Sequence, residues 1–440
     1  MNKDLLELAN SAVRTALASG ADACSASVST DRSVEISYRE RKPETIKEAA
    51  TRGLALRFYV DGRYSAQSTS DLRPDALKRF IADAVQMTRL LAADPDRTLP
   101  DPKHFAGRQA LDLALVDPQQ DRLSATERHD LVRAAEAACL AAGGSGVVSA
   151  TSGWNDGRSE NVLVTSNGCQ GYSESTYFVQ SLEVTLQDEG DRRPNGYDWA
   201  VATRRADLPA PEALGASVVQ RTRALLGAKK LKTETLPVIV ENRNVGRVLN
   251  ALLQAMGARN IQQKQSFLAE KKGQKIGSDL LTLVDDPFVP RGLGSRLFDG
   301  EGITAQRRTM IEAGVLKEFF VDWYYGRKLG WEPTTAGPSN LVIPPGSRSV
   351  AQIMKDLGRG ILVNGFIGGN ANSTTGDFSV GITGHLFENG EPTQAIAEMN
   401  LAGNSLELWG NLVEVANDPW PYSAMRMPSL AFKDLVVAGV

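Results

Sequence analysis

The sequence predicts an α+β protein, with N-terminal α/β units built on mixed or antiparallel sheets and a strand-rich C-terminal domain. Two groups of helical patterns interleaved with short β-branched runs come first, and a Pro- and Asp-rich stretch separates them. Further on, Gly and Pro recur every few residues and strand patterns dominate. Because 440 residues with 42% hydrophobic composition can bury the cores of two or three domains, we expect an N-terminal α+β unit over 1–95, a linker over 96–120, a middle α+β unit over 121–230 and a C-terminal β-rich domain over 231–440.

In the first unit, apolar residues at near-helical spacing predict a helix over residues 4–18, which ends at Gly20. The Asp61-Gly62 pair predicts a tight hairpin turn, and a second helix is expected over 74–91. Short runs of β-branched and aromatic residues between the two helices predict five strands, at 22–30, 33–40, 44–53, 54–60 and 64–70.

In the middle unit, Ser124 and Glu127 form a capping-box pattern that begins a helix running to Ala142. A further helix is expected from Pro211 to Leu226, because proline is tolerated in the first turn. Four strands are expected between these helices, at 146–154, 160–168, 171–187 and 196–204, with turns at Ser166-Asn167-Gly168 and at Gly196.

The third unit begins with a short buried strand near Leu236 and an amphipathic helix over 245–258. Phe378, Val380 and Ile382 alternate with small or polar residues, which predicts a strand. An Asn-Gly turn then leads to a partner strand. The polar, glycine-rich stretch NGFIGGNANSTTGD therefore leads into a hairpin.

Composition excludes several classes of function. A net charge of −3 argues against a dedicated nucleic-acid binder. The sequence has no apolar run long enough to cross a membrane, and its amphipathic N-terminus contains acids, so we expect a cytoplasmic protein. Cys24, Cys139 and Cys169 are odd in number and far apart, which favours reduced thiols.

The glycine-rich stretch is the candidate functional surface. It lacks the lysine and the following helix of a phosphate-binding loop, so an extended peptide fits it better than a nucleotide. A hydroxyl nucleophile would need a base, yet Asp377 and His385 lie up to about 26 Å apart on an extended strand. Clustered carboxylates elsewhere, such as Asp285-Asp286, are typical of solvated turns and strand ends. The expected substrate or partner contacts are Asn370, Asn372, Ser373, Thr374, Thr375, Asp377 and His385.

Four blocks of the sequence, at 277–287, 299–322, 368–391 and 417–432, resemble in their order the TldD/TldE (PmbA) family, also called peptidase U62 or modulators of DNA gyrase. In the TldD branch a helix carries His-Glu-x-x-x-His, and its histidines hold a catalytic zinc with a later cysteine. Here Gln254, Ala255 and Arg259 stand at the corresponding positions, and no cysteine follows Cys169. The chain therefore resembles the TldE (PmbA) branch, which lacks the metal.

The resemblance implies a non-catalytic, substrate-binding subunit that pairs with a TldD-type zinc protease and helps it to cleave unfolded or leader peptides. Zinc is then expected in the partner, with no cofactor in this chain, and a homodimer can form when the chain is alone. One alternative is an autonomous peptidase that uses a Ser or Thr nucleophile. Another is a gyrase- or DNA-associated interaction protein, which the net acidity disfavours.

Overall fold

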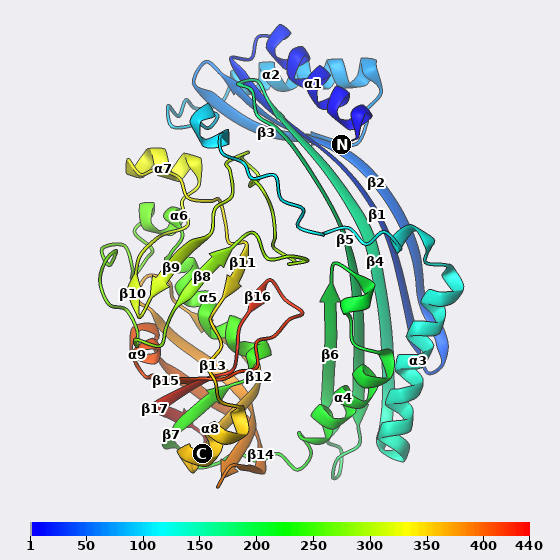
Figure 1. Cartoon of the computed structure of the whole chain (residues 1–440), viewed down its shortest axis with the longest axis vertical. Coiled ribbons are helices and arrows are strands. Elements are labelled where there is room, and N and C mark those ends of the chain that lie inside the picture. The colour runs from blue at the N-terminus through cyan, green and yellow to red at the C-terminus, as the bar shows by residue number, and fades with distance from the viewer. Residues whose placement is uncertain (1) are drawn as a thin grey trace.

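The computed structural model describes residues 2–440 and begins with one long, curved antiparallel sheet in the order β3-β2-β1-β4-β5-β6 (Figure 1). Strand β1 pairs with β4 from Ser25 opposite Thr165 to Arg39 opposite Thr151, so residues of the first and middle segments share this sheet. Its strands are β1 Ala23–Arg39, β2 Lys42–Val60, β3 Arg63–Thr69, β4 Val147–Thr165, β5 Gln170–Leu186 and β6 Asn195–Ala202.

The five strands expected between the first two helices are in fact three long ones, and the four expected in the middle unit are also three. The prediction placed a break near Asp31 and Arg32, but both lie within the continuous strand β1. The hairpin turn at Asp61-Gly62 is confirmed, with both residues at positive φ.

The turn predicted at Gly196 is wrong, because this residue lies inside β6. A Cβ built on Gly196 would lie 1.9 Å from the Thr222 hydroxyl oxygen on helix α4. The glycine thus permits a close approach between strand and helix and does not mark a turn.

Four helices cover one face of this sheet: α1 Lys3–Ala18, α2 Pro74–Thr88, α3 Ala125–Gly143 and α4 Pro211–Arg223. Figure 1 shows α1 and α2 at one end of the sheet and α3 and α4 at the other. The capping box predicted at Ser124 and Glu127 is present. Along β4, Ala150, Ser152 and Trp154 are buried, whereas Thr151 and Gly153 on the other face are partly exposed. The helix-covered face therefore holds the apolar core of this part of the chain.

The C-terminal part is built around a closed barrel. Strands β14, β13, β12, β7 and β17 are neighbours in this order, and pairing of β14 with β17 closes the circle, while β15 extends from β17. The strands concerned are β7 Glu234–Val240, β12 Arg359–Ala371, β13 Asp377–Glu388, β14 Glu391–Asn404, β15 Leu412–Val415 and β17 Leu430–Ala438. The Asn389-Gly390 turn between β13 and β14 is confirmed.

A second, five-stranded sheet and several short helices accompany the barrel. The sheet has the order β10-β9-β8-β11-β16, formed by β8 Leu283–Asp286, β9 Arg308–Glu312, β10 Val315–Leu316, β11 Asn340–Val342 and β16 Met425–Arg426. The helices are α5 Val245–Ala255, α6 Ala258–Gln262, α7 Trp323–Leu329, α8 Val350–Leu357 and α9 Ser405–Gly410. Single 3-10 turns lie at Pro102–Phe105, Gln120–Arg122, Gly144–Gly146, Arg205–Asp207 and Asn242–Asn244. None of the helices in residues 2–440 is both long and apolar enough to cross a membrane.

Candidate functional site

Helix α5 and the glycine-rich end of β12 enclose a small groove of about 190 Å³, which we call the α5–bulge groove. It brings one predicted contact residue, Asn370, beside one of the positions aligned with a zinc ligand, Gln254. The lining residues are Arg247, Val248, Asn250, Ala251, Gln254, Gly369, Asn370, Ala371, Phe378, Val380, Ser405 and Leu408.

The helical repeat of α5 decides which of its side chains reach this groove. Arg247, Asn250 and Gln254 are three and four residues apart and lie on one exposed face. Leu249 and Leu252, on the opposite face, are fully buried in the main core of the C-terminal part. Burial of the apolar stripe therefore fixes the orientation of the polar one.

A double-glycine bulge shapes the other side of the groove. The register between β12 and β13 shifts between Ile367 and Asn370, and Gly368 and Gly369 have φ of 58° and 95°. A Cβ on Gly369 would lie 2.6 Å from the Ser379 carbonyl oxygen, so only glycine fits. Arg247 Nη2 donates to the carbonyl oxygens of Gly368 at 2.8 Å and Gly369 at 3.2 Å, which ties the bulge to α5.

Three of the predicted contact residues build the turn that follows. The Asn372 side-chain oxygen accepts from Thr374 N at 2.8 Å, and the Thr375 hydroxyl donates to Asp377 Oδ2 at 2.7 Å. Asn404 Nδ2 donates to Asp377 Oδ1 at 3.0 Å. The Thr375 hydroxyl, followed by the Asn404 amide, lowers the pKa of Asp377 below its ordinary value. Asn372, Thr375 and Asp377 are therefore committed to holding the turn.

The other three loop residues make no such bonds. Within residues 2–440, the side chains of Asn370, Ser373 and Thr374 take part in no hydrogen bond, and Asn370 and Thr374 are exposed. The Ser373 carbonyl oxygen accepts from Phe267 N at 2.9 Å, which anchors the backbone of the loop. The side chains of these three residues thus remain available to a ligand or a partner chain.

The structure does not bring His385 to the loop. Asp377 begins strand β13, and His385 lies eight residues further along the same strand. His385 Nε2 donates to the Ala224 carbonyl oxygen at 2.6 Å, and Nδ1 lies 3.0 Å from Asn364 Oδ1. His385 therefore joins the barrel to the end of α4 and is not a base for the loop hydroxyls.

The positions that the resemblance aligns with zinc ligands are separated in the fold. Gln254 lines the groove, Ala255 is fully buried in the core, and Arg259 lies on α6 after α5 has ended. An amide, a methyl group and a guanidinium do not supply the imidazole, thiolate or carboxylate donors that zinc requires. Nowhere in residues 2–440 do three or more His, Cys, Asp or Glu side chains gather as a metal site.

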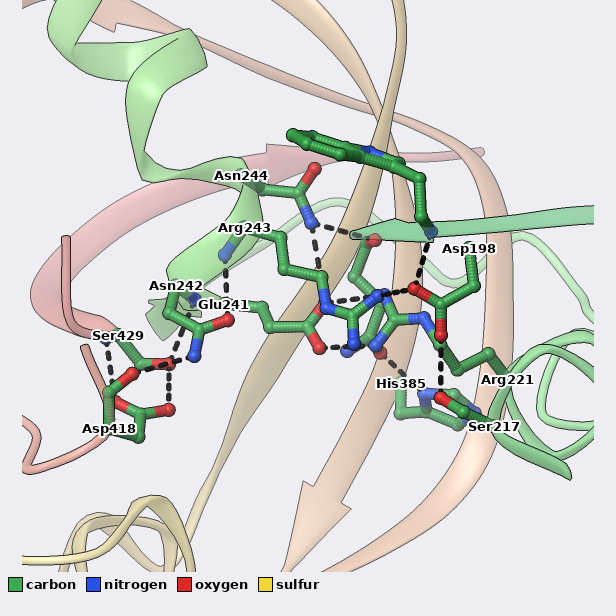
Figure 2. A network of polar contacts seen from close by, with 12 residues as sticks. Asp198, Ser217, Arg221, Glu241, Asn242, Arg243, Asn244, His385, Asp418 and Ser429 are labelled. Atoms are coloured by element: carbon green, nitrogen blue, oxygen red, sulfur yellow. Dashed lines mark hydrogen bonds and ion pairs between the residues drawn. The ribbon is translucent and has the colours of Figure 1, made fainter. Parts of the chain in front are cut away.

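A network of polar contacts that no local sequence pattern predicts joins the long sheet to the barrel (Figure 2). Arg221 on α4 donates to Glu241 beyond β7, with Nη2 to Oε2 at 2.8 Å. Arg243 pairs in the opposite sense with Asp198 on β6, which is 1% exposed. Asp198 also accepts from the Ser217 hydroxyl at 2.6 Å. The long-sheet part contributes Arg221 and Asp198, and the C-terminal part contributes Glu241 and Arg243. We call these two ion pairs the crossed pair.

The crossed pair lies beside a larger cavity of about 800 Å³ between α4, β6 and the outside of the barrel. The hydrogen bonds of Arg221 to Glu241 raise the pKa of this guanidinium. Burial, and then the nearby charge of Arg221, lower the pKa of Arg243. His385, Asn364, Trp199 and Phe366 are among the other polar and aromatic residues of the lining.

The chain folds into an α+β protein with a long antiparallel sheet and a closed barrel, and comparison with known families identifies its class. Family models for the PmbA/TldA metallopeptidase match at residues 24–88 for domain 1, 118–226 for the central domain and 233–439 for the C-terminal domain. The chain belongs to the PmbA/TldD family, as its motifs predict.

Individual relatives match over almost the whole chain. Metalloprotease PmbA from Escherichia coli O157:H7 is 31% identical over 97% of this chain and 95% of its own length. A PmbA homolog from Haemophilus influenzae is 26% identical over 99% of this chain and 96% of its own length. A crystal structure from Bacteroides thetaiotaomicron, described as a candidate modulator of DNA gyrase, superposes with a TM-score of 0.97 at 35% identity and full coverage of both chains. TldE from Thermococcus kodakarensis shares the fold, with a TM-score of 0.86. It is 23% identical, and the superposition covers 98% of this chain and all of the other.

Proposed function

We propose that this chain is the non-catalytic, substrate-binding subunit of a protease complex in which a TldD-type chain carries the zinc and cleaves unfolded or leader peptides. The observation that carries the proposal is the donor set of the α5–bulge groove. Where the resemblance places a metal-binding histidine, the groove presents the carboxamide of Gln254, and the neighbouring Asn250 and Asn370 are also carboxamides. These groups can bind a peptide but cannot activate water as a metal-bound hydroxide would.

The course of β12 supports an extended substrate. This strand pairs with β7 only over Ile361–Val363, so among residues 2–440 the strand that pairs with it from residue 364 onward is β13. Side chains of Asn244 and Arg247 occupy the carbonyl oxygens of Asn364, Gly368 and Gly369, and the other main-chain groups of this stretch form its edge. An extended peptide can add to such an edge through main-chain hydrogen bonds. The neighbouring loop side chains of Asn370, Ser373 and Thr374 then lie along its path.

The proposal includes a heterodimer with a TldD-type protease subunit, zinc in that partner and a cytoplasmic location. A homodimer is the form expected when the chain is produced alone. With its net charge of −3, the chain is not expected to bind nucleic acid.

The test replaces the three available loop side chains, as Asn370→Ala/Ser373→Ala/Thr374→Ala, and keeps the three that hold the turn. Thermal unfolding should be unchanged, whereas casein cleavage by the reconstituted complex should fall about tenfold, equivalent to ~1.4 kcal/mol. Thr51→Ala, an exposed residue on β2, serves as the control. Unchanged cleavage by the triple variant would contradict the proposal.

A second assay separates the alternatives. The purified chain alone should not cleave casein, with or without a chelator. Chelator-resistant cleavage by the chain alone would favour an autonomous peptidase with a Ser or Thr nucleophile. Salt-sensitive retention on DNA at physiological ionic strength would instead favour a DNA-associated role.

A further inference from the structure

We propose that the α5–bulge groove binds one peptide unit of an extended chain together with a small, uncharged apolar side chain. The inference deepens the proposed function, on which it rests for the identity of the ligand as an unfolded chain. It adds which part of that chain this subunit recognises.

Three carboxamides face the groove and supply the polar recognition. Asn250, Gln254 and Asn370 are all exposed, and within residues 2–440 none of their side chains takes part in a hydrogen bond. A carboxamide offers two N–H donors and a carbonyl acceptor, which match the C=O and N–H of a peptide group. Because these side chains are neutral and can rotate, they bind the main chain of any sequence.

The floor of the groove sets the size of the accompanying side chain. Val248, Ala251, Val380 and Leu408 are buried beneath the carboxamides and present an apolar surface. The volume of about 190 Å³ is below the ~300–1,000 Å³ of pockets for drug-sized ligands. We assign one small aliphatic side chain with its peptide group to this space, and a bulky aromatic side chain is the larger probe that tests this size limit.

The charge of the lining disfavours cationic ligands. Arg247 is the one charged residue among those that line the groove, and it donates to the Gly368 and Gly369 carbonyl oxygens through Nη2 alone, so its positive charge is not neutralised. An ammonium that entered would lose water and meet a like charge without gaining an ion pair. The ligand is therefore a peptide segment with no cationic side chain at this position.

The test measures direct binding of dye-labelled, end-blocked hexapeptides to the chain alone by fluorescence anisotropy. The reference peptide has four central alanines between two lysines, and in two others one central alanine is replaced by phenylalanine or lysine. We expect the replaced peptides to bind about tenfold more weakly. A fourth peptide, N-methylated at the central amides, should also bind weakly, because it cannot donate to the carboxamides. Equal affinity for all four peptides would overturn the proposal.

Variants of the chain locate the site. Asn250→Ala/Gln254→Ala should weaken binding of the alanine peptide about tenfold, while Gln119→Ala, an exposed amide outside the groove, should not. Ala371→Leu, at an exposed position on the rim, should block the groove without disturbing the core. Binding that survives in both groove variants, with their melting temperatures unchanged, would show that the peptide binds elsewhere.

The two proposals can fail separately. If the chain binds the alanine peptide in this groove but the complex with a TldD-type partner cleaves nothing, the protease role fails and the peptide site stands. In the opposite case, the complex cleaves casein equally well with the parent chain and with Asn250→Ala/Gln254→Ala, and the chain alone binds all the peptides equally. The groove assignment then fails and the protease role stands.

Discussion

At the scale of single residues, the crossed ion pairs have the largest predicted energetic effect. Asp198 and Arg243 are 45 residues apart in sequence, yet they meet where the carboxylate is almost completely buried. Arg243→Met removes the cation and leaves this charge uncompensated. The free energy of unfolding, measured with denaturant, should fall by about 3–5 kcal/mol.

A double variant provides the control. In Arg243→Met/Asp198→Asn the buried charge is also removed, and the amide can still hydrogen-bond to Ser217. We expect it to be more stable than Arg243→Met alone, since the cost arises from an unpaired charge. A double variant less stable than the single one would contradict this explanation.

Arg247 offers a second prediction at this scale. Arg247→Ala removes the donor to the Gly368 and Gly369 carbonyl oxygens, so amide hydrogen exchange in residues 366–372 should become faster. Because Arg247 is exposed, global stability should change by less than about 1 kcal/mol. Arg259→Ala, an exposed arginine on α6, should leave exchange in this segment unchanged.

At the scale of elements, the double-glycine bulge requires residues that can adopt positive φ. Gly369→Ala places a methyl group at φ of 95° and against the Ser379 carbonyl oxygen, so we expect a loss of about 1–3 kcal/mol of unfolding free energy. Gly410→Ala is the matched control, since a Cβ there meets no atom within 4 Å. Equal stability of the two variants would mean that the bulge can relax.

Helix positions were predictable because their signals are local. The capping box at Ser124 and the amphipathic repeat of 245–255 each fix an element within one stretch of sequence. Strand lengths were not predictable in this way. Charged and small residues such as Asp31, Arg32 and Gly153 interrupt the apolar pattern, yet each lies inside a continuous strand. Asp31 and Gly153 are on the face that the helices do not cover, whereas Arg32 points to the other face.

At the scale of the whole molecule, a buried carboxyl lies where the long sheet meets the C-terminal part. Burial raises the pKa of Glu301 to about 7, and the carboxylates of Asp299 and Asp322 act in the same direction. Arg57 on β2 donates to the adjacent Gly300 carbonyl oxygen at 3.1 Å, and Trp323 N donates to Glu301 Oε2 at 2.9 Å. The turn at 299–302 thus joins β2 to the start of α7.

The pH dependence follows from the raised pKa. The folded state holds the proton of Glu301 more tightly than the unfolded state does. The unfolding free energy should therefore fall as pH rises from about 4.5 to 7 and then level off. The loss from this group should be about 3 kcal/mol. Glu301→Gln should be more stable than the parent at pH 8 and similar at pH 4. Denaturant unfolding at both pH values measures this, and Glu270→Gln, an exposed carboxylate, is the control. An equal difference at both pH values would contradict the assignment.

The candidate site shows the same division between local and distant signals. The density of Gly, Asn, Ser and Thr predicted the loop, and the resemblance pointed to Gln254; the structure then placed Asn370 and Gln254 in one groove. The partnership of Asp198 with Arg243 could not be predicted, because neither residue lies in a distinctive local pattern and the contact exists only when the sheet and barrel are assembled.

The closed barrel has a consequence for how the chain is made. Strand β17 is a neighbour of β7 and also pairs with β14 and β15, although its partner residues in β7 precede it by 190 to 203 positions, from Leu430 opposite Val240 to Val437 opposite Glu234. Closing so long a loop slows folding, and on the ribosome β7 and β14 must wait for the last strand to emerge. A nascent chain halted before Leu430 would display the apolar side chains of Val238 and Val240, which makes premature termination a direct route to aggregation and proteolysis.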